Sequence, residues 1–107
     1  MEKVTEIFLS EINIVPIQPR DGLIGFCSFV LNGQFYVGDI GLHSRPSGEI
    51  RLLYPDRVLP NGKIISSFHP ITKDAGSKIT REISRKYNDI LTDLISRSML
   101  RGYDNEI

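Results

Sequence analysis

The stretch that decides the fold runs from residue 23 to residue 42 and reads LIGFCSFVLNGQFYVGDIGL. Two strand-like apolar runs, 23–31 and 34–42, flank the dipeptide Asn32-Gly33. A tight two-residue turn between paired strands needs positive φ at both central positions, which asparagine and glycine tolerate better than other residues. The stretch therefore predicts an antiparallel hairpin that turns at Asn32-Gly33, with no helix between residues 23 and 42.

The first strand of this hairpin is apolar on both faces. Strict alternation puts one set on one face (Ile24, Phe26 and Val30) and a second set on the other (Leu23, Cys27, Phe29 and Leu31). A strand of this kind must be covered from both sides. Because a single helix can cover only one face, we expect a homodimer joined through β-strands, or a sheet that folds back on itself.

The remaining elements follow on either side of the hairpin. We expect a strand over residues 4–17 that is closed by Pro16 and Pro19, because proline cannot donate a hydrogen bond to a sheet. After the hairpin come a short strand over 50–54, a loop over 55–62 and a last strand over 63–68. Strands first and one helix last predict an α+β fold, with an antiparallel sheet of about five strands and one long C-terminal amphipathic helix.

The helix is expected over residues 72–99, with Thr72 or Asp74 as its cap, Ile71 as a staple residue and a frayed tail over 102–107. Its apolar positions recur at spacings of three and four and form one stripe: Ile79, Ile83, Tyr87, Ile90, Leu91, Leu94 and Ile95. Lys78, Arg81 and Arg85 fall together on nearly the opposite side. This trio is either a solvated polar face or part of a basic binding surface.

Length and composition predict one globular domain, residues 1–107. The chain has 40% hydrophobic and 24% charged residues, which is ordinary for a folded protein. No apolar run approaches the roughly 20 residues that span a bilayer, and the polar start Met1–Glu6 is unlike a secretory signal. A lone cysteine, Cys27, lies in an apolar run and is expected to be a buried hydrophobic side chain. We expect a cytoplasmic protein without a membrane partner.

The charges are distributed unevenly along a chain whose net charge is zero. Residues 1–44 carry two basic and five acidic groups, residues 45–86 carry nine and four, and residues 87–107 carry two and four. A neutral domain is not typical of a strong nucleic-acid binder, whose pI usually exceeds about 9. The excess of five positive charges in the middle segment nevertheless favours a local basic surface.

Motifs for catalysis are missing from the sequence. There is no glycine-rich phosphate loop and no nucleophile elbow, and His43, His69 and Cys27 have no metal-ligand spacing. His69 precedes Pro70 and is expected to hydrogen-bond backbone at the start of the helix. Asp39 is expected to point outward, and Tyr36 to pack rather than stack on bases. We therefore expect no enzyme, no cofactor, no metal and no small-molecule substrate.

The segment from Tyr54 to Ile71 reads YPDRVLPNGKIISSFHPI and resembles the signature region of the SpoVG (stage V sporulation protein G) family. The match rests on Pro55, Gly62 and the run His69-Pro70-Ile71 at identical spacing, with Arg57 at a position that is basic in the family. The resemblance covers roughly residues 4–95, including the apolar hairpin and the helix. It implies a homodimeric regulator that binds DNA or RNA site-selectively and is linked to septation, sporulation and gene control.

Three positions depart from the family pattern. Val58 replaces the second member of a basic pair, Asp56 replaces a serine, and Ser66 replaces an aspartate. Two hypotheses remain open: a nucleic-acid-binding dimer, and a dimeric protein-interaction module on the same fold. The candidate nucleic-acid-binding residues are two in the 55–68 region, one in the preceding strand and three on the helix: Arg57, Lys63, Arg51, Lys78, Arg81 and Arg85.

Overall fold

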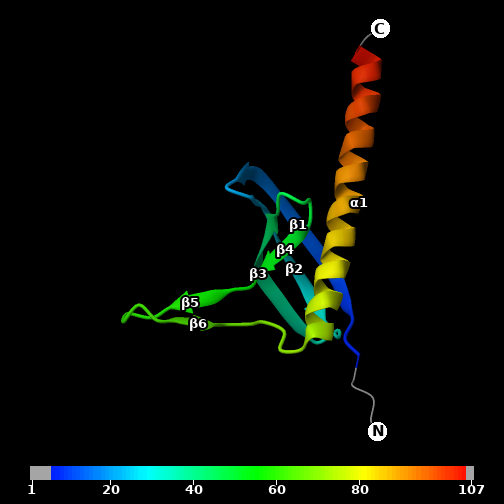
Figure 1. Ribbon diagram of the computed structural model, residues 1–107. Helices are drawn as coiled ribbons and strands as arrows, with labels where there is room; N and C mark the ends of the chain where they lie inside the picture. The colour runs from blue at the N-terminus through cyan, green and yellow to red at the C-terminus, as the bar shows by residue number, and fades with distance from the viewer. Residues whose placement is uncertain (1–5, 106–107) are drawn as a thin grey trace.

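The structure, a computed structural model, describes the chain from residue 6 to residue 105, with side chains through residue 99. It is an α+β fold in which a four-stranded antiparallel sheet, a projecting two-stranded arm and one long helix follow each other in the chain (Figure 1). The sheet has the order β1-β2-β3-β4 and consists of β1 (Leu9–Arg20), β2 (Leu23–Leu31), β3 (Phe35–Ser44) and β4 (Ile50–Leu53). The arm is formed by β5 (Asp56–Val58) and β6 (Ile64–Ser66), and the helix is α1 (Lys73–Asn105).

The predicted hairpin is confirmed. β2 and β3 pair antiparallel from Leu31 opposite Phe35, and the turn residues Asn32 and Gly33 have φ of 51° and 67°. The backbone amide of Gln34 donates to the carbonyl of Leu31 at 3.0 Å and closes the turn. The Asn32 side chain accepts a hydrogen bond from the amide of Phe8 at 2.8 Å, so the turn also holds the segment before β1.

Two β-bulges keep acidic side chains out of the core. β3 carries one extra residue between its pairs with Cys27 and Phe29, and Asp39 lies there with φ of 60°. β1 carries a similar irregularity between Ser10 and Asn13, with Glu11 at φ of 50°. Each bulge shifts the alternation by one position. Val37 and Ile40 can therefore both face the helix while Asp39 stays exposed, as expected from the sequence.

The first strand does not end at its prolines, contrary to the prediction. β1 begins at Leu9, later than expected, and continues through Pro16 and Pro19 to Arg20; residues 6–8 are not in a strand, and Val4 lies outside the described residues. The reason is its position at the edge of the sheet, where a missing amide can face solvent. The two prolines and the bulge at Glu11 also make this edge a poor template for a further strand.

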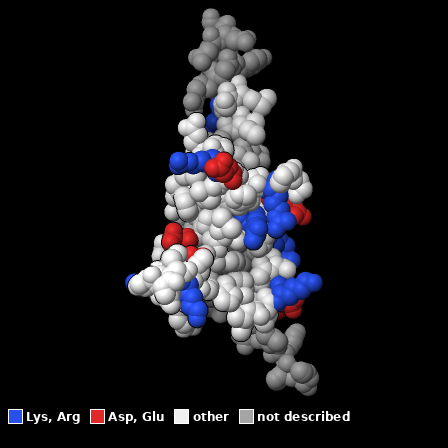
Figure 2. Space-filling view, turned by 60° about the vertical axis from the view of Figure 1, so that its left-hand side comes forward, with Lys and Arg blue, Asp and Glu red and all other residues white. Residues whose placement is uncertain are grey.

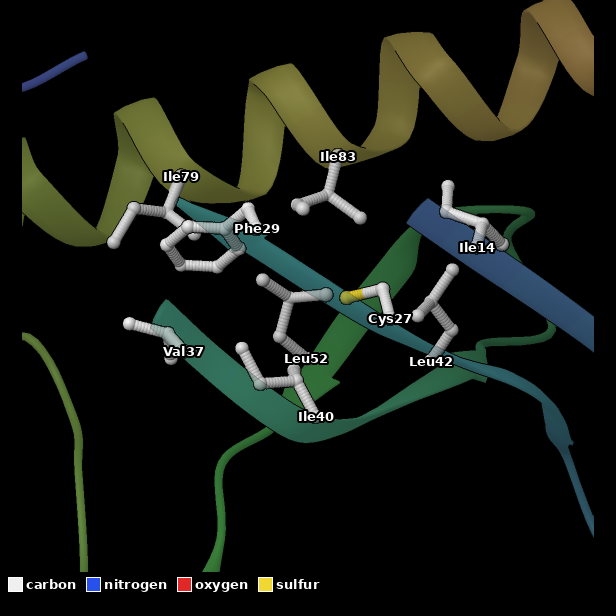
Figure 3. Close-up of a cluster of buried hydrophobic side chains, with 9 residues drawn as sticks. All are labelled: Ile14, Cys27, Phe29, Val37, Ile40, Leu42, Leu52, Ile79 and Ile83. Carbon is white, nitrogen blue, oxygen red and sulfur yellow. The ribbon is translucent and has the colours of Figure 1, made fainter. Parts of the chain in front are cut away.

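The core lies between α1 and one face of the sheet (Figure 3). Ile79 and Ile83 point from the helix onto a layer of buried sheet side chains: Ile14, Cys27, Phe29, Val37, Ile40, Leu42 and Leu52. Tyr54 extends this layer with a buried hydroxyl that has no hydrogen-bond partner among the described residues. Cys27 is a buried side chain, as predicted. The helix thus covers one face of the sheet.

The other side of the four-stranded sheet, here called the open face, is not covered by any element within residues 6–105 of the same chain. One row across it joins Val15, Phe26, Gly41 and Leu53, which are direct cross-strand neighbours. Tyr36 is also exposed, so the expectation that it packs is wrong. An irregularity between Leu23 and Gly25 exchanges the faces expected for two side chains. Ile24 packs against the core, whereas Leu23 lies close to Gly41.

The loop expected over residues 55–62 is wrong in its first half. Asp56–Val58 form strand β5, which pairs antiparallel with β6. Pro55 and Pro60 on either side of this segment are typical of a loop. Asp56–Val58 nevertheless forms a strand, because Ile64–Ser66 pairs with it. The strand expected over residues 63–68 is shorter than predicted and covers only Ile64–Ser66.

The helix begins as predicted and extends further. The Thr72 hydroxyl accepts a hydrogen bond from the amide of Ala75 at 3.1 Å, which makes Thr72 the N-cap. Ile71 is exposed and forms no staple. The helix continues to Asn105, through part of the expected tail; residues 106 and 107 lie outside the described residues. Beyond the sheet its apolar stripe is exposed at Leu91, Leu94, Ile95 and Met99.

Replacing Gly33 by valine should lower the free energy of unfolding by about 1 kcal/mol or more, because a β-branched residue resists positive φ. The site is suited to this test, since an added Cβ would meet only the Phe8 ring, at 3.8 Å. Urea denaturation measures the change. An unchanged unfolding free energy would contradict the turn geometry.

The core predicts a loss of stability at alkaline pH. Burial raises the pKa of the Cys27 thiol from 9.0 to about 12, and burial together with nearby Cys27 raises the pKa of Tyr54 from 10.0 to about 12. Both groups lose their protons at a lower pH in the unfolded chain than in the folded one. The stability they contribute is therefore complete below about pH 9 and is lost as pH rises towards 12.

The variant Cys27→Ala tests this directly by denaturation across that pH range. Between pH 9 and 12 its unfolding free energy should fall less steeply than that of the parent, by about 1 kcal/mol per pH unit. Parallel curves for the two proteins would show that folding does not raise the pKa of the Cys27 thiol.

Candidate nucleic-acid interface

The β5–β6 arm, residues 55–67, is a narrow ribbon that begins where β4 ends and returns to the chain before α1. Its pairs run from Asp56 opposite Ser66 to Val58 opposite Ile64. Backbone hydrogen bonds extend the ribbon at both ends, from Ser67 to Pro55 at 3.0 Å and from Leu59 to Lys63 at 2.7 Å. At its tip Gly62 has φ of 87°, a conformation that glycine adopts at no steric cost. The arm extends from the side of the sheet opposite the helix (Figure 1).

The arm has two different faces. Because paired residues share a face and successive residues alternate, Arg57, Leu59, Lys63 and Ile65 lie on one face. Asp56, Val58, Ile64 and Ser66 lie on the other. Asp56 is therefore on the opposite face from Arg57, although it precedes Arg57 in the chain. Arg57 and Lys63 are exposed, and neither forms an ion pair with a group in the described part of the chain.

A second group of cations lies beside the root of the arm, at the edge of β4. A cleft of about 310 Å³ is lined there by Arg45, Glu49, Arg51 and Tyr54 together with Gly76 and Thr80 of α1. A neighbouring hollow shares Gly76 and Thr80 and adds Lys73 and Arg81. We call the two together the edge cleft. Tyr54 lines it and also packs against Phe68, with ring centroids 5.8 Å apart, so the cleft and the arm meet at this aromatic pair.

The structure therefore divides the six candidate residues among three places. Arg57 and Lys63 share a face of the arm, and Arg51 and Arg81 line the edge cleft. Lys78 and Arg85 lie on the helix outside both, where Arg85 is 3.6 Å from Glu82. Sequence reasoning did not name Arg45 and Lys73 as site residues. Their only signal was membership of the basic segment 45–86, because they line neighbouring hollows only through the packing of the helix start beside β4.

The basic side chains do not merge into one patch on the face seen in Figure 2. Lys and Arg occur there in separate groups, and Asp or Glu lies next to several of them. Over the whole chain, too, acidic groups balance the basic ones, and the net charge is zero. Since affinity for nucleic acid follows the number of phosphates that are neutralised, one chain offers a few separate groups of cations rather than one wide basic surface.

The two histidines both have local hydrogen-bond partners. His69 Nδ1 is 2.7 Å from the Ser66 hydroxyl, at the end of the arm, rather than bonded to backbone at the helix start as expected. His43 Nε2 is 3.0 Å from the carbonyl oxygen of Asp21. Within residues 6–105, the structure contains no group of three or more His, Cys, Asp or Glu side chains arranged to hold a metal ion.

The sequence matches no protein-family model, and a search of curated proteins finds no similar sequence. In the part of the chain that the structure describes, α1 is too polar to cross a membrane.

Proposed function

We propose that this protein is a cytoplasmic, homodimeric regulatory protein of the SpoVG type that binds DNA or RNA. Under this proposal it acts in septation, sporulation or gene regulation, as the resemblance of residues 54–71 implies. It has no catalytic activity and needs no cofactor. The proposal rests on the family-like segment and on where that segment lies in the fold.

The observation that carries the proposal is the shared face of Arg57 and Lys63 on a ribbon that projects from the domain. A two-stranded ribbon is narrow enough to approach a nucleic acid, and its exposed cations can reach phosphates without a competing ion pair. The edge cleft at the root of the arm adds Arg45, Arg51, Lys73 and Arg81. A second copy would double this set and lengthen the track of cations along a phosphate backbone.

A protein-interaction module is the second candidate, and a specific observation favours it. Val58 and Ile64 occupy the other face of the arm and are exposed, although such side chains are usually buried. Val58 also stands where the family has a basic residue. On this alternative the arm contacts protein only, and the cations of the edge cleft are ordinary solvated charges.

The double variant Arg57→Ala, Lys63→Ala distinguishes the two candidates on duplex and single-stranded DNA across a salt series. If both side chains contact phosphates, binding should weaken similarly on all sequences, and the slope of log affinity against log salt should decrease by about two for each copy of the chain that contacts the nucleic acid. The loss should be largest at low salt, where counterion release contributes most to affinity.

The matched control is Lys86→Ala, Arg97→Ala, which also removes two exposed cations but lies on the helix, outside the arm, the edge cleft and the six candidate residues. We expect this control to keep the parent affinity and slope. Equal losses in the two double variants would contradict a site on the arm. A parent protein that binds no nucleic acid at low salt would leave the interaction module as the function.

A further inference from the structure

We infer that the apolar face of the β5–β6 arm docks on the open sheet face of a second copy of this chain, so that two chains exchange arms. The inference rests on the homodimer of the proposed function and names the surfaces that form it. On this arrangement Val58 and Ile64 pack against the row Val15, Phe26 and Leu53 of the partner.

The arm needs a partner because its own chain does not support it. Its two strands have three residues each and pair only with each other. None of their side chains belongs to the core or packs against it. A two-stranded hairpin is at best marginally stable in water, and independent stability requires further strands or packing on an apolar surface. A stable arm therefore needs an apolar surface to pack on, and residues 6–105 of its own chain do not provide one.

The open face needs a cover for the same reason. Val15, Phe26 and Leu53 are 54%, 40% and 39% exposed, although they lie in one row across the four strands, with only Gly41 between Phe26 and Leu53. On the apolar face of the arm, Val58 and Ile64 are 64% and 65% exposed. Together these five residues expose roughly 500 Å² per copy, more than half of the about 800 Å² per partner that a standard protein interface buries. Exposed apolar patches of this size often mark interaction surfaces.

A second copy is the occupant that satisfies both surfaces at once. The helix covers one side of the sheet and the arm extends from the other, which is the side of the open face (Figure 1). Two copies with their open faces turned toward each other would each lie beside the arm of the other. A twofold axis then places the arm of each copy on the open face of the other, so the same contact occurs twice. Exchange of an identical element is a common route to dimers.

The two faces of the arm acquire separate roles in this dimer. The face with Val58 and Ile64 turns toward the partner, while the opposite face keeps Arg57 and Lys63 exposed. Docking would therefore fix the position of these cations relative to the partner's edge cleft. The basic track would be complete only when two chains have joined.

The test is cross-linking between two differently tagged variants, Ile64→Cys and Val15→Cys, which are mixed and treated with a short bismaleimide. Both positions are exposed, so the substitutions should leave the fold intact. The native Cys27 is buried and stays unreactive. We expect a cross-linked species that carries both tags. The control replaces Val15→Cys by Asn88→Cys, an exposed position on the helix, and should give little of this product.

Equal yields with Val15→Cys and Asn88→Cys, or no mixed product with either, would overturn the inference. A second pair of variants tests the same contact without a cross-linker. Ile64→Asp should raise the dissociation constant of the dimer at least about tenfold, because it would bury an unpaired charge in the interface. Ile71→Asp, at a position 89% exposed and outside the arm, should not. Equal dissociation constants for these two variants would also overturn it.

Nucleic-acid binding, measured on the same samples, separates this inference from the proposed function. Binding without mixed cross-links would reject arm exchange and keep the nucleic-acid-binding function. Mixed cross-links without binding at low salt would keep arm exchange and favour the interaction module.

Discussion

The structure depends on one geometric constraint, which is that a single helix can cover only one face of a sheet. Here the helix-side face is filled by Phe29, Ile40 and Leu42, which are completely buried under Ile79 and Ile83. The opposite face carries Val15, Phe26 and Leu53, and no second layer covers it in the part of the chain that the structure describes. In a domain of this size the buried surface supports only a thin stability margin, so further burial between chains is favourable.

The bulges show how the sheet meets this constraint without placing a charge in the core. In regular alternation Glu11 would share a face with Leu9, and Asp39 would share a face with Val37. Burying either carboxylate without a partner would cost several kcal/mol. The extra residue in each strand exposes the acid instead, at the smaller cost of a left-handed backbone conformation. The apolar pattern of β1 and β3 is thus continuous on the helix side although the sequence alternation is broken.

Local signals in the sequence were sufficient for the hairpin and the helix. Asn32-Gly33 determines its own turn, and the stripe from Ile79 to Ile90 follows from spacing alone. The arm was missed in part, because Asp56–Val58 becomes a strand only through its pairing with β6, which no local pattern encodes. The exchange of Leu23 and Ile24 between faces has the same origin, since a bulge depends on the neighbouring strand.

The candidate site was predictable to a similar extent. Arg57 and Lys63 were found through the spacing of a family-like motif, and the fold places them on one face of the arm. Arg45 and Lys73 come from separate parts of the chain and line neighbouring hollows of the edge cleft only because the start of α1 packs beside β4. A contact of this kind depends on tertiary packing and leaves no spacing pattern to read.

The central claim is that the open face is covered by a second copy of the chain. Sedimentation equilibrium of the unmodified protein tests it most directly, because this measurement gives the mass in solution without a label or a substitution. We expect twice the mass of one chain at micromolar concentration, with dissociation to single chains only on dilution. A mass of one chain across that range would contradict the account, because the apolar open face would then be stable in water without a partner.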